Sequence, residues 1–130
     1  MKIVKKILKV LLIILIVIIV IGVIFVPIDI KKQKEVRNLS IEKVDLTKLE
    51  DGKYTGNYKK YRWNYNVEVT INNHKITDIN IINDMYNNDK FNNELIGNVI
   101  EKQNVDVDTV SGATISSKVM LKAIENALNK

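Results

Sequence analysis

An uncharged apolar run near the N-terminus constrains this chain more than any other feature. From Val10 to Ile28, 19 consecutive residues carry no charge, and nearly all of them are Ile, Leu or Val. At about 1.5 Å per residue, a helix of this length comes close to spanning the ~30 Å hydrocarbon core of a bilayer. The run is longer than the roughly 7–15 apolar residues of a secretory signal, and no A-x-A-like cleavage site follows it. It predicts an uncleaved transmembrane anchor, with a cleaved signal peptide as the alternative.

The charges on either side of this run do not by themselves fix its orientation. Four basic residues precede it and four follow it: Lys2, Lys5, Lys6 and Lys9, then Lys31, Lys32, Lys34 and Arg37. The positive-inside count is therefore a tie. A short cationic tail that leads directly into an apolar run is typical of an export signal. We therefore expect a single-pass protein of the cell membrane, anchored in the lipid bilayer, with its C-terminal domain on the extracytoplasmic side.

The chain divides into three parts by composition. Residues 1–28 form the tail and the transmembrane anchor, residues 29–50 a charged stem or linker, and residues 51–130 a soluble domain. Of the 20 Lys and Arg and the 15 Asp and Glu, residues 31–130 hold 16 and 14, which gives these residues a net charge of only +2. Because the basic residues do not gather on one periodic face, we expect no nucleic-acid partner.

Cysteine is absent from the chain. Disulfides, thiolate metal sites and cysteine-ligated iron–sulfur clusters are therefore excluded. His74 is the only histidine, and no second ligand or nucleophile stands beside it in the sequence. We interpret it as a solvated turn residue. The sequence predicts neither a metal site nor a catalytic residue.

The soluble part begins with a pattern typical of strands. Apolar residues alternate with polar ones over residues 67–71 and again from Ile79, and the turn sequence NNHK separates the two stretches. This pattern predicts an antiparallel hairpin with one buried face. Before it, the stretch DGKYTG supplies Gly52 and Gly56, which we interpret as turn glycines.

Two amphipathic helices follow. Apolar residues recur at helical spacing from Phe91 to Ile100 and again from Val119 to Leu128. The Asn-rich residues 83–93 indicate a polar loop before the first of these helices. The predicted fold class is α+β: an N-terminal transmembrane helix followed by a small antiparallel sheet packed by two helices.

Small residues are concentrated just before the last helix. In DTVSGATISSKV, residues 108–119, an Asp is followed by a run of small side chains that carries two hydroxyl groups. A structural interpretation is available: Ser111 or Thr114 caps the helix, Gly112 supplies an unusual backbone dihedral angle, and Ala113 packs tightly against the sheet.

The same stretch resembles the flavinylation motif of FMN-binding domains. The matching pattern, D-x-x-S-G-A-T-x-S-S, is formed by Asp108, Ser111, Gly112, Ala113, Thr114, Ser116 and Ser117. Such domains occur in subunits of the sodium-pumping NADH:quinone reductase and the ion-pumping ferredoxin:NAD oxidoreductase, and in membrane-tethered bacterial flavoproteins. The likeness extends to DGKYTG, to the hairpin and to the closing helix, and so covers residues 51–128.

This resemblance implies a covalent cofactor. In the family, the hydroxyl group of the threonine that matches Thr114 carries FMN through a phosphoester, which a magnesium-dependent flavin transferase installs from FAD. The other six residues of the pattern are expected to shape or contact the cofactor site. Gly112 and Ala113 would leave the hydroxyl open to the transferase, and Asp108 would serve the transferase or the turn, because a carboxylate repels a phosphate.

The resemblance also implies a function. We expect a membrane-tethered extracytoplasmic flavoprotein that relays electrons between membrane or extracellular redox partners. Two alternatives remain: a flavin-bearing subunit of an extracytoplasmic reductase, and a flavin-free anchored binding module in which the small residues only cap a helix. Tyr61, Trp63 and Tyr65 are expected either to stack on the flavin ring or to take part in ordinary packing.

Overall fold

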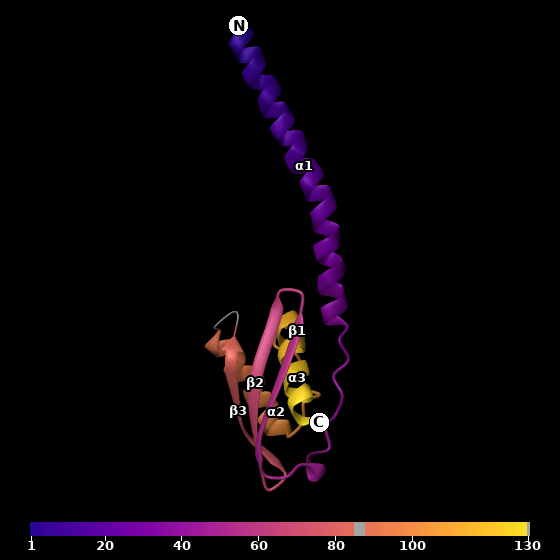
Figure 1. Cartoon of the computed structure of the whole chain (residues 1–130), viewed down its shortest axis with the longest axis vertical. Coiled ribbons are helices and arrows are strands. Elements are labelled where there is room, and N and C mark those ends of the chain that lie inside the picture. Colours follow the sequence, from indigo (N-terminus) through magenta and orange to yellow (C-terminus); the bar gives the residue numbers. More distant parts are fainter. Residues whose placement is uncertain (85–87, 130) are drawn as a thin grey trace. The chain divides into compact units, whose positions relative to one another are not determined.

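The computed structural model of the chain describes residues 1–84 and 88–129. Contacts divide the chain into two units, Met1–Lys34 and Glu35–Lys130. The first unit is helical throughout its described length after Met1, and the second is a small domain of strands and helices (Figure 1). In chain order the elements are α1 (Lys2–Arg37), the 3-10 turn η1 (Leu46–Lys48), β1 (Gly52–Lys60), β2 (Trp63–Asn72), β3 (Lys75–Asp84), α2 (Asp89–Lys102) and α3 (Thr114–Leu128).

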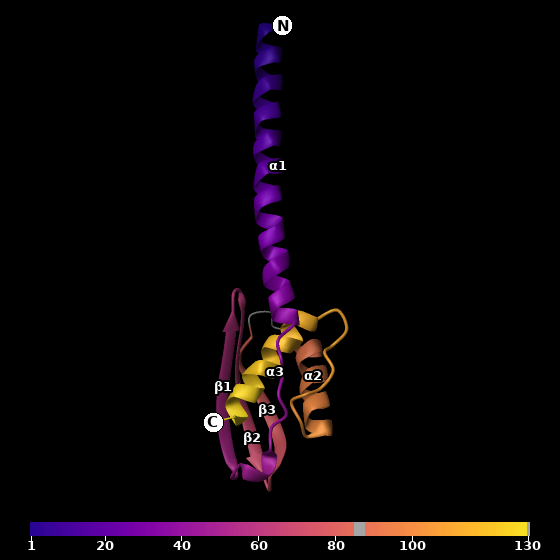
Figure 2. The same cartoon turned by 90° about the vertical axis from the view of Figure 1, so that its right-hand side faces the viewer.

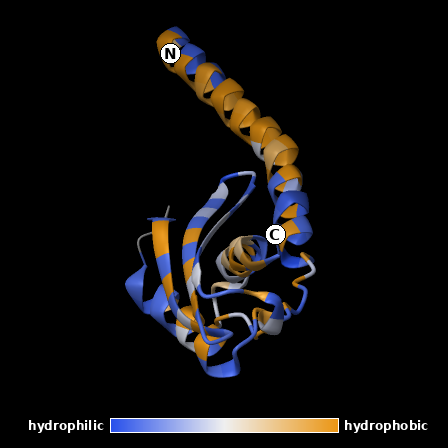
Figure 3. Ribbon diagram, turned by 60° about the horizontal axis from the view of Figure 1, so that its bottom comes forward, coloured by the Kyte–Doolittle hydropathy of each residue, from blue (hydrophilic) through white to orange (hydrophobic). Residues whose placement is uncertain are grey.

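Helix α1 contains the apolar run. It is 36 residues long, and Pro27 lies within it. Apolar colour follows the helix through successive turns (Figure 3), and its most apolar 18-residue window has no buried residue. A helix that is apolar on all sides needs an apolar environment around it. By length and composition, α1 is a candidate membrane span.

The three strands form one antiparallel sheet in the order β1–β2–β3. Every second side chain of β2 is buried, as in a strand with one face on the core: Trp63, Tyr65, Val67, Val69 and Ile71. In the β2–β3 pairing Val69 lies opposite Ile79, and Val67 lies opposite Ile81. The hairpin predicted from these residues is confirmed.

A two-residue turn joins β2 to β3. Asn73 and His74 have φ values of +50° and +58°, as both central residues of a type I′ turn require. The exposed His74 ring has its Nδ1 atom 2.9 Å from the backbone oxygen of Leu49. Among residues 1–84 and 88–129, no group of three or more His, Asp or Glu side chains is placed to hold a metal ion.

Both helices cover the buried face of the sheet. Helix α3 packs on β1 and β2, and α2 packs beside β3 (Figure 2). Each helix contributes its apolar face to the core, with Phe91, Leu95 and Val99 from α2, and Val119, Met120, Ala123, Ile124, Ala127 and Leu128 from α3. The predicted helices and the α+β class are thereby confirmed.

Gly56 is not a turn glycine. It lies in the middle of β1, opposite Val67, where α3 crosses the strand. A Cβ atom on Gly56 would lie 2.4 Å from both the backbone oxygen of Ala123 and the backbone nitrogen of Ala127. Glycine is required there because the backbones of the strand and the helix approach each other too closely for any side chain.

The prediction of a polar loop over residues 83–93 is also wrong at both ends of this range. Strand β3 continues to Asp84, and α2 already begins at Asp89. The side chain of Asn88 caps this helix by accepting a hydrogen bond from the N–H of Phe91, at 3.2 Å. An Asn-rich stretch therefore supplies a strand end and a helix cap, while residues 85–87 lie outside the described part of the chain.

The second unit begins well before residue 51. Val36 and Val44 are buried, so the segment 35–50 contributes to the core. Three polar contacts join it to α3: Lys118 Nζ donates to the Leu39 oxygen at 3.1 Å, Lys122 Nζ donates to the Ser40 oxygen at 3.2 Å, and the Glu42 N–H donates to Glu125 Oε2 at 3.0 Å. The residues assigned to a stem or linker therefore divide between α1 and a segment that packs on the domain.

Candidate functional site

The site is built on the tight turn that leads into α3. The N–H of Ala113 donates to the oxygen of Val110 at 3.0 Å and closes a four-residue turn. Gly112 occupies the third position of this turn with φ +78°, the value that a type II turn requires there. A Cβ atom on Gly112 would meet no atom within 4 Å. The backbone conformation at this position, and not lack of space, therefore favours glycine.

A buried hydroxyl group fixes the turn to the helix. The Oγ atom of Ser117 accepts a hydrogen bond from the N–H of Val110 at 3.0 Å and donates one to the oxygen of Ala113 at 2.7 Å. The side chain is fully buried, below the turn. Ser117 thus holds both ends of the turn in place and is a positioning residue for the surface above it.

The first turn of α3 has no side-chain cap. Ala113 occupies the N-cap position, so neither Ser111 nor Thr114 serves as the cap that the structural interpretation suggested. The first N–H groups of an α-helix have no acceptor within the helix, and they form the positive end of its dipole. At α3 these groups belong to residues 114–116, and no side chain caps them.

Two pockets adjoin the turn, one on each side. The first, here called the Arg37 pocket, has a volume of about 200 Å³ and is lined by Arg37 and residues 112–116. The second, here called the α2 pocket, has a volume of about 330 Å³ and is lined by residues 110–113 together with Asn88, Lys90, Phe91 and Glu94. Gly112 and Ala113 line both pockets, so the turn forms the ridge between them.

The residues of the predicted motif take different places around this ridge. Half-buried Thr114, the first residue of α3, and half-buried Ser116 line the Arg37 pocket. Ser111 is exposed and lines the α2 pocket. Asp108 is exposed and lines neither pocket. The fold therefore brings five residues of the motif to the pockets, namely Ser111, Gly112, Ala113, Thr114 and Ser116.

Residues that the sequence did not suggest complete the two pockets. Arg37 ends α1, 74 positions before Ser111, and no local pattern links the two. Lys90, Phe91 and Glu94 come from the first turns of α2. Phe91 was predicted only as part of the apolar face of an amphipathic helix, and the charged residues beside it give no separate signal in the sequence.

The aromatic residues before the hairpin do not line either pocket. Trp63 and Tyr65 are buried among core side chains, which agrees with ordinary packing. Tyr61 is exposed, and its hydroxyl group donates to the carboxylate of Glu35. This hydrogen bond raises the pKa of Tyr61, and the ion pair of Lys60 with the same carboxylate, at 2.6 Å, raises the pKa of Lys60.

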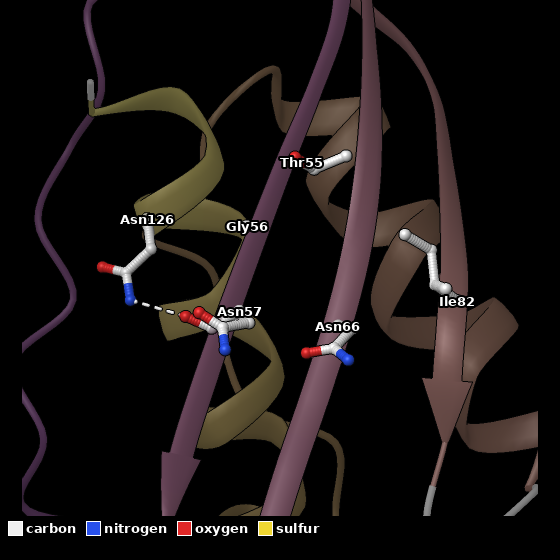
Figure 4. Close-up of a pocket in the computed structure, with 6 residues that line it drawn as sticks. All are labelled: Thr55, Gly56, Asn57, Asn66, Ile82 and Asn126. Carbon is white, nitrogen blue, oxygen red and sulfur yellow. Dashed lines mark hydrogen bonds between the residues drawn. The ribbon is translucent and has the colours of Figure 1, made fainter.

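A larger hollow lies elsewhere on the domain. It has a volume of about 410 Å³ and is lined by Thr55, Gly56, Asn57, Asn66, Ile82 and Asn126 (Figure 4). The side chain of Asn126 donates to the oxygen of Asn57 at 2.9 Å across its edge. None of these lining residues is ionisable or belongs to the motif. The chemistry of the turn therefore makes the two pockets beside α3 the stronger candidate site.

Comparison with known proteins identifies the family of the chain. The family model described as FMN-binding domain matches residues 61–129, which are 69 of the 130 residues. The matched region runs from the β1–β2 turn to the end of α3, and so it contains the turn and the α2 pocket. The curated proteins give no significant match. On the family match, the chain belongs to the FMN-binding domain family.

Proposed function

We propose that Thr114 carries FMN covalently through a phosphoester, and that the domain relays electrons at the extracytoplasmic face of a membrane. The observation that carries the proposal is the position of Thr114. This residue begins α3, lines a pocket, and follows a turn of small residues in a domain of the FMN-binding family. The full motif from Asp108 to Ser117 is present around it.

The proposed attachment requires an accessible hydroxyl group. Ser111 and Gly112 are exposed, and Thr114 and Ala113 are half-buried, so this face of the turn is open. A large transferase with FAD and magnesium bound can approach Thr114 from this side. In the transfer, the Thr114 oxygen forms the bond to the phosphorus of the FMN half of FAD, the pyrophosphate bond breaks, AMP leaves, and the hydroxyl proton passes to solvent.

The residues present suit an attached phosphate. The N–H groups of residues 114–116 lie at the positive end of α3, where anions are stabilised. Among the described residues, no carboxylate lines the Arg37 pocket. Ser117 holds the turn from below and so fixes the position of the attachment residue. These residues bind and orient, and they hold the phosphate without any proton transfer.

Bound FMN would supply the electron chemistry, and the chain would fix its position and its exposure. The ionisable residues that line the two pockets are Arg37, Lys90 and Glu94. The described residues of this lining include one carboxylate and no histidine, cysteine or second acid that could form a general acid–base pair with it. The proposal is therefore an electron relay rather than an enzyme that turns over a substrate on its own.

Intact mass measurement tests the covalent bond. The protein, produced together with a flavin transferase, should gain the mass of FMN less one water and should keep flavin fluorescence after denaturation. Thr114→Val should abolish both signals, because valine has nearly the same shape as threonine but no acceptor oxygen. Thr114→Ser keeps the hydroxyl group and serves as the matched variant that should still accept FMN. Covalent flavin on the valine protein would contradict the assignment.

A further inference from the structure

We propose that Arg37 binds the phosphate group of the attached FMN; this inference rests on the function proposed above. Arg37 and residues 112–116 line one pocket of about 200 Å³. A guanidinium and the polar groups of this turn suit a phosphate, and the described residues of the lining include no aromatic side chain on which a flavin ring could stack. Thr114, the attachment residue, lies in the same lining.

The charge of Arg37 is available to a ligand. Its side chain makes no ion pair or hydrogen bond with any residue in 1–84 or 88–129, whereas four other basic side chains, those of Lys48, Lys53, Lys60 and Lys122, are paired with carboxylates. The other residues of the Arg37 pocket are uncharged: Gly112, Ala113, Thr114, Ile115 and Ser116. A planar guanidinium with several N–H donors matches the oxygens of a phosphate better than an ammonium group does.

The two pockets differ in the ligand that they favour. The α2 pocket is larger, at about 330 Å³, and its lining includes the almost wholly buried Phe91 and the acidic residue Glu94. A carboxylate repels a phosphate, so the phosphate is assigned to the Arg37 pocket. The α2 pocket then remains for the larger, flatter part of the cofactor.

This contact would join the cofactor to a part of the chain outside the family match. The matched region begins at Tyr61, and Arg37 lies at the start of the segment that packs on α3. The contact should weaken with salt because Arg37 is exposed.

A thermodynamic cycle that combines one substitution with the presence or absence of FMN tests the contact, by thermal unfolding of the full chain in detergent micelles. Wild type and Arg37→Gln are each melted with and without FMN, and circular dichroism reports the unfolding. The quantity compared is the rise in melting temperature that FMN attachment produces in each protein. We expect this rise to be smaller in Arg37→Gln by about 4 °C or more, since 1 kcal/mol shifts the melting temperature of a domain of this size by about 4–8 °C. Lys43→Gln removes an exposed charge from the same segment and should keep the full rise.

The outcomes separate this inference from the proposed function. An equal rise in wild type and Arg37→Gln would overturn the phosphate contact while leaving the covalent flavin intact. A folded Arg37→Gln protein that fails to accept FMN, while Arg37→Lys accepts it, would support the contact, because lysine restores the charge. Absence of any FMN mass on wild type would instead refute the proposed function.

Discussion

At the scale of single residues, there are two possible reasons for glycine at position 112. Glycine permits the positive φ of the turn, and its lack of a side chain leaves Thr114 open to a transferase. Its φ of +78° strains any L-residue with a Cβ, so Gly112→Ala should lower the free energy of unfolding by about 1–2 kcal/mol. Gly112→Asn should cost less, because asparagine tolerates the left-handed region. Urea unfolding of the two variants measures the difference. Equal costs for alanine and asparagine would show that the backbone conformation is not the constraint.

The asparagine variant also tests access to Thr114. It adds bulk on an exposed residue of the turn without the full strain of alanine, so folded Gly112→Asn protein should accept FMN more slowly than wild type if the transferase must fit over the turn.

Ser117 offers a second test at this scale. Ser117→Ala removes the acceptor for the Val110 N–H and leaves that group without a partner, while the Ala113 oxygen loses the hydroxyl but still accepts the backbone N–H of residue 117. The expected loss of stability is about 1–3 kcal/mol by urea unfolding. Ser116→Ala is the matched control, since Ser116 is half-buried in the same turn of α3 and should change stability by about 0.5 kcal/mol or less. Similar losses for both variants would mean that the Ser117 hydrogen bonds do not hold the turn.

The motif residues could be identified as site residues from the sequence, but Arg37 could not. A small-residue pattern is local, so residues 111–117 could be found in one reading of the chain. Arg37 reaches the same pocket only because the segment from Glu35 packs along α3, and this packing depends on contacts between residues about 80 positions apart, such as Glu42 with Glu125. Long-range contacts of this kind leave no periodic signal.

At the scale of elements, the crossing of α3 over β1 depends on Gly56. Gly56→Ala would place a Cβ atom 2.4 Å from backbone atoms of both Ala123 and Ala127, so the helix or the strand must move. Overpacking of this kind costs about 1–3 kcal/mol, occasionally more. Gly97→Ala is the control within α2: its Cβ would meet nothing within 4 Å, and alanine should stabilise the helix by about 0.5–1 kcal/mol. A Gly56→Ala protein as stable as wild type would mean that α3 does not pack this closely.

The elements themselves were largely predictable, because alternation in β2 and helical spacing in α2 and α3 follow directly from burial on one side. The wrong predictions concern residue types that occur in two kinds of structure. Gly56 was assigned to a turn by its neighbours, yet a close helix approach selects glycine equally well. The Asn-rich stretch 83–93 was assigned to a loop, yet Asn88 is also a favoured helix cap.

At the scale of the whole molecule, α1 is a candidate membrane span, and the side of the membrane on which the domain would lie follows from its orientation. Four basic residues on each side of the apolar run leave the charge count tied, so the prediction of an extracytoplasmic domain rests on the cationic N-terminal tail. A domain on that side would meet extracytoplasmic redox partners, and a domain on the other side would meet cytoplasmic ones.

The absence of cysteine makes this orientation directly measurable. Single cysteines are introduced at Asn129, which is exposed at the end of α3, and at Ile3, which is 73% exposed in the N-terminal tail. Neither substitution changes the charge count. In intact cells or spheroplasts, a membrane-impermeant maleimide should label Asn129→Cys, and it should label Ile3→Cys only after the membrane is opened. The reverse pattern would place the domain in the cytoplasm, and labelling of both positions in sealed cells would mean that α1 does not span the membrane.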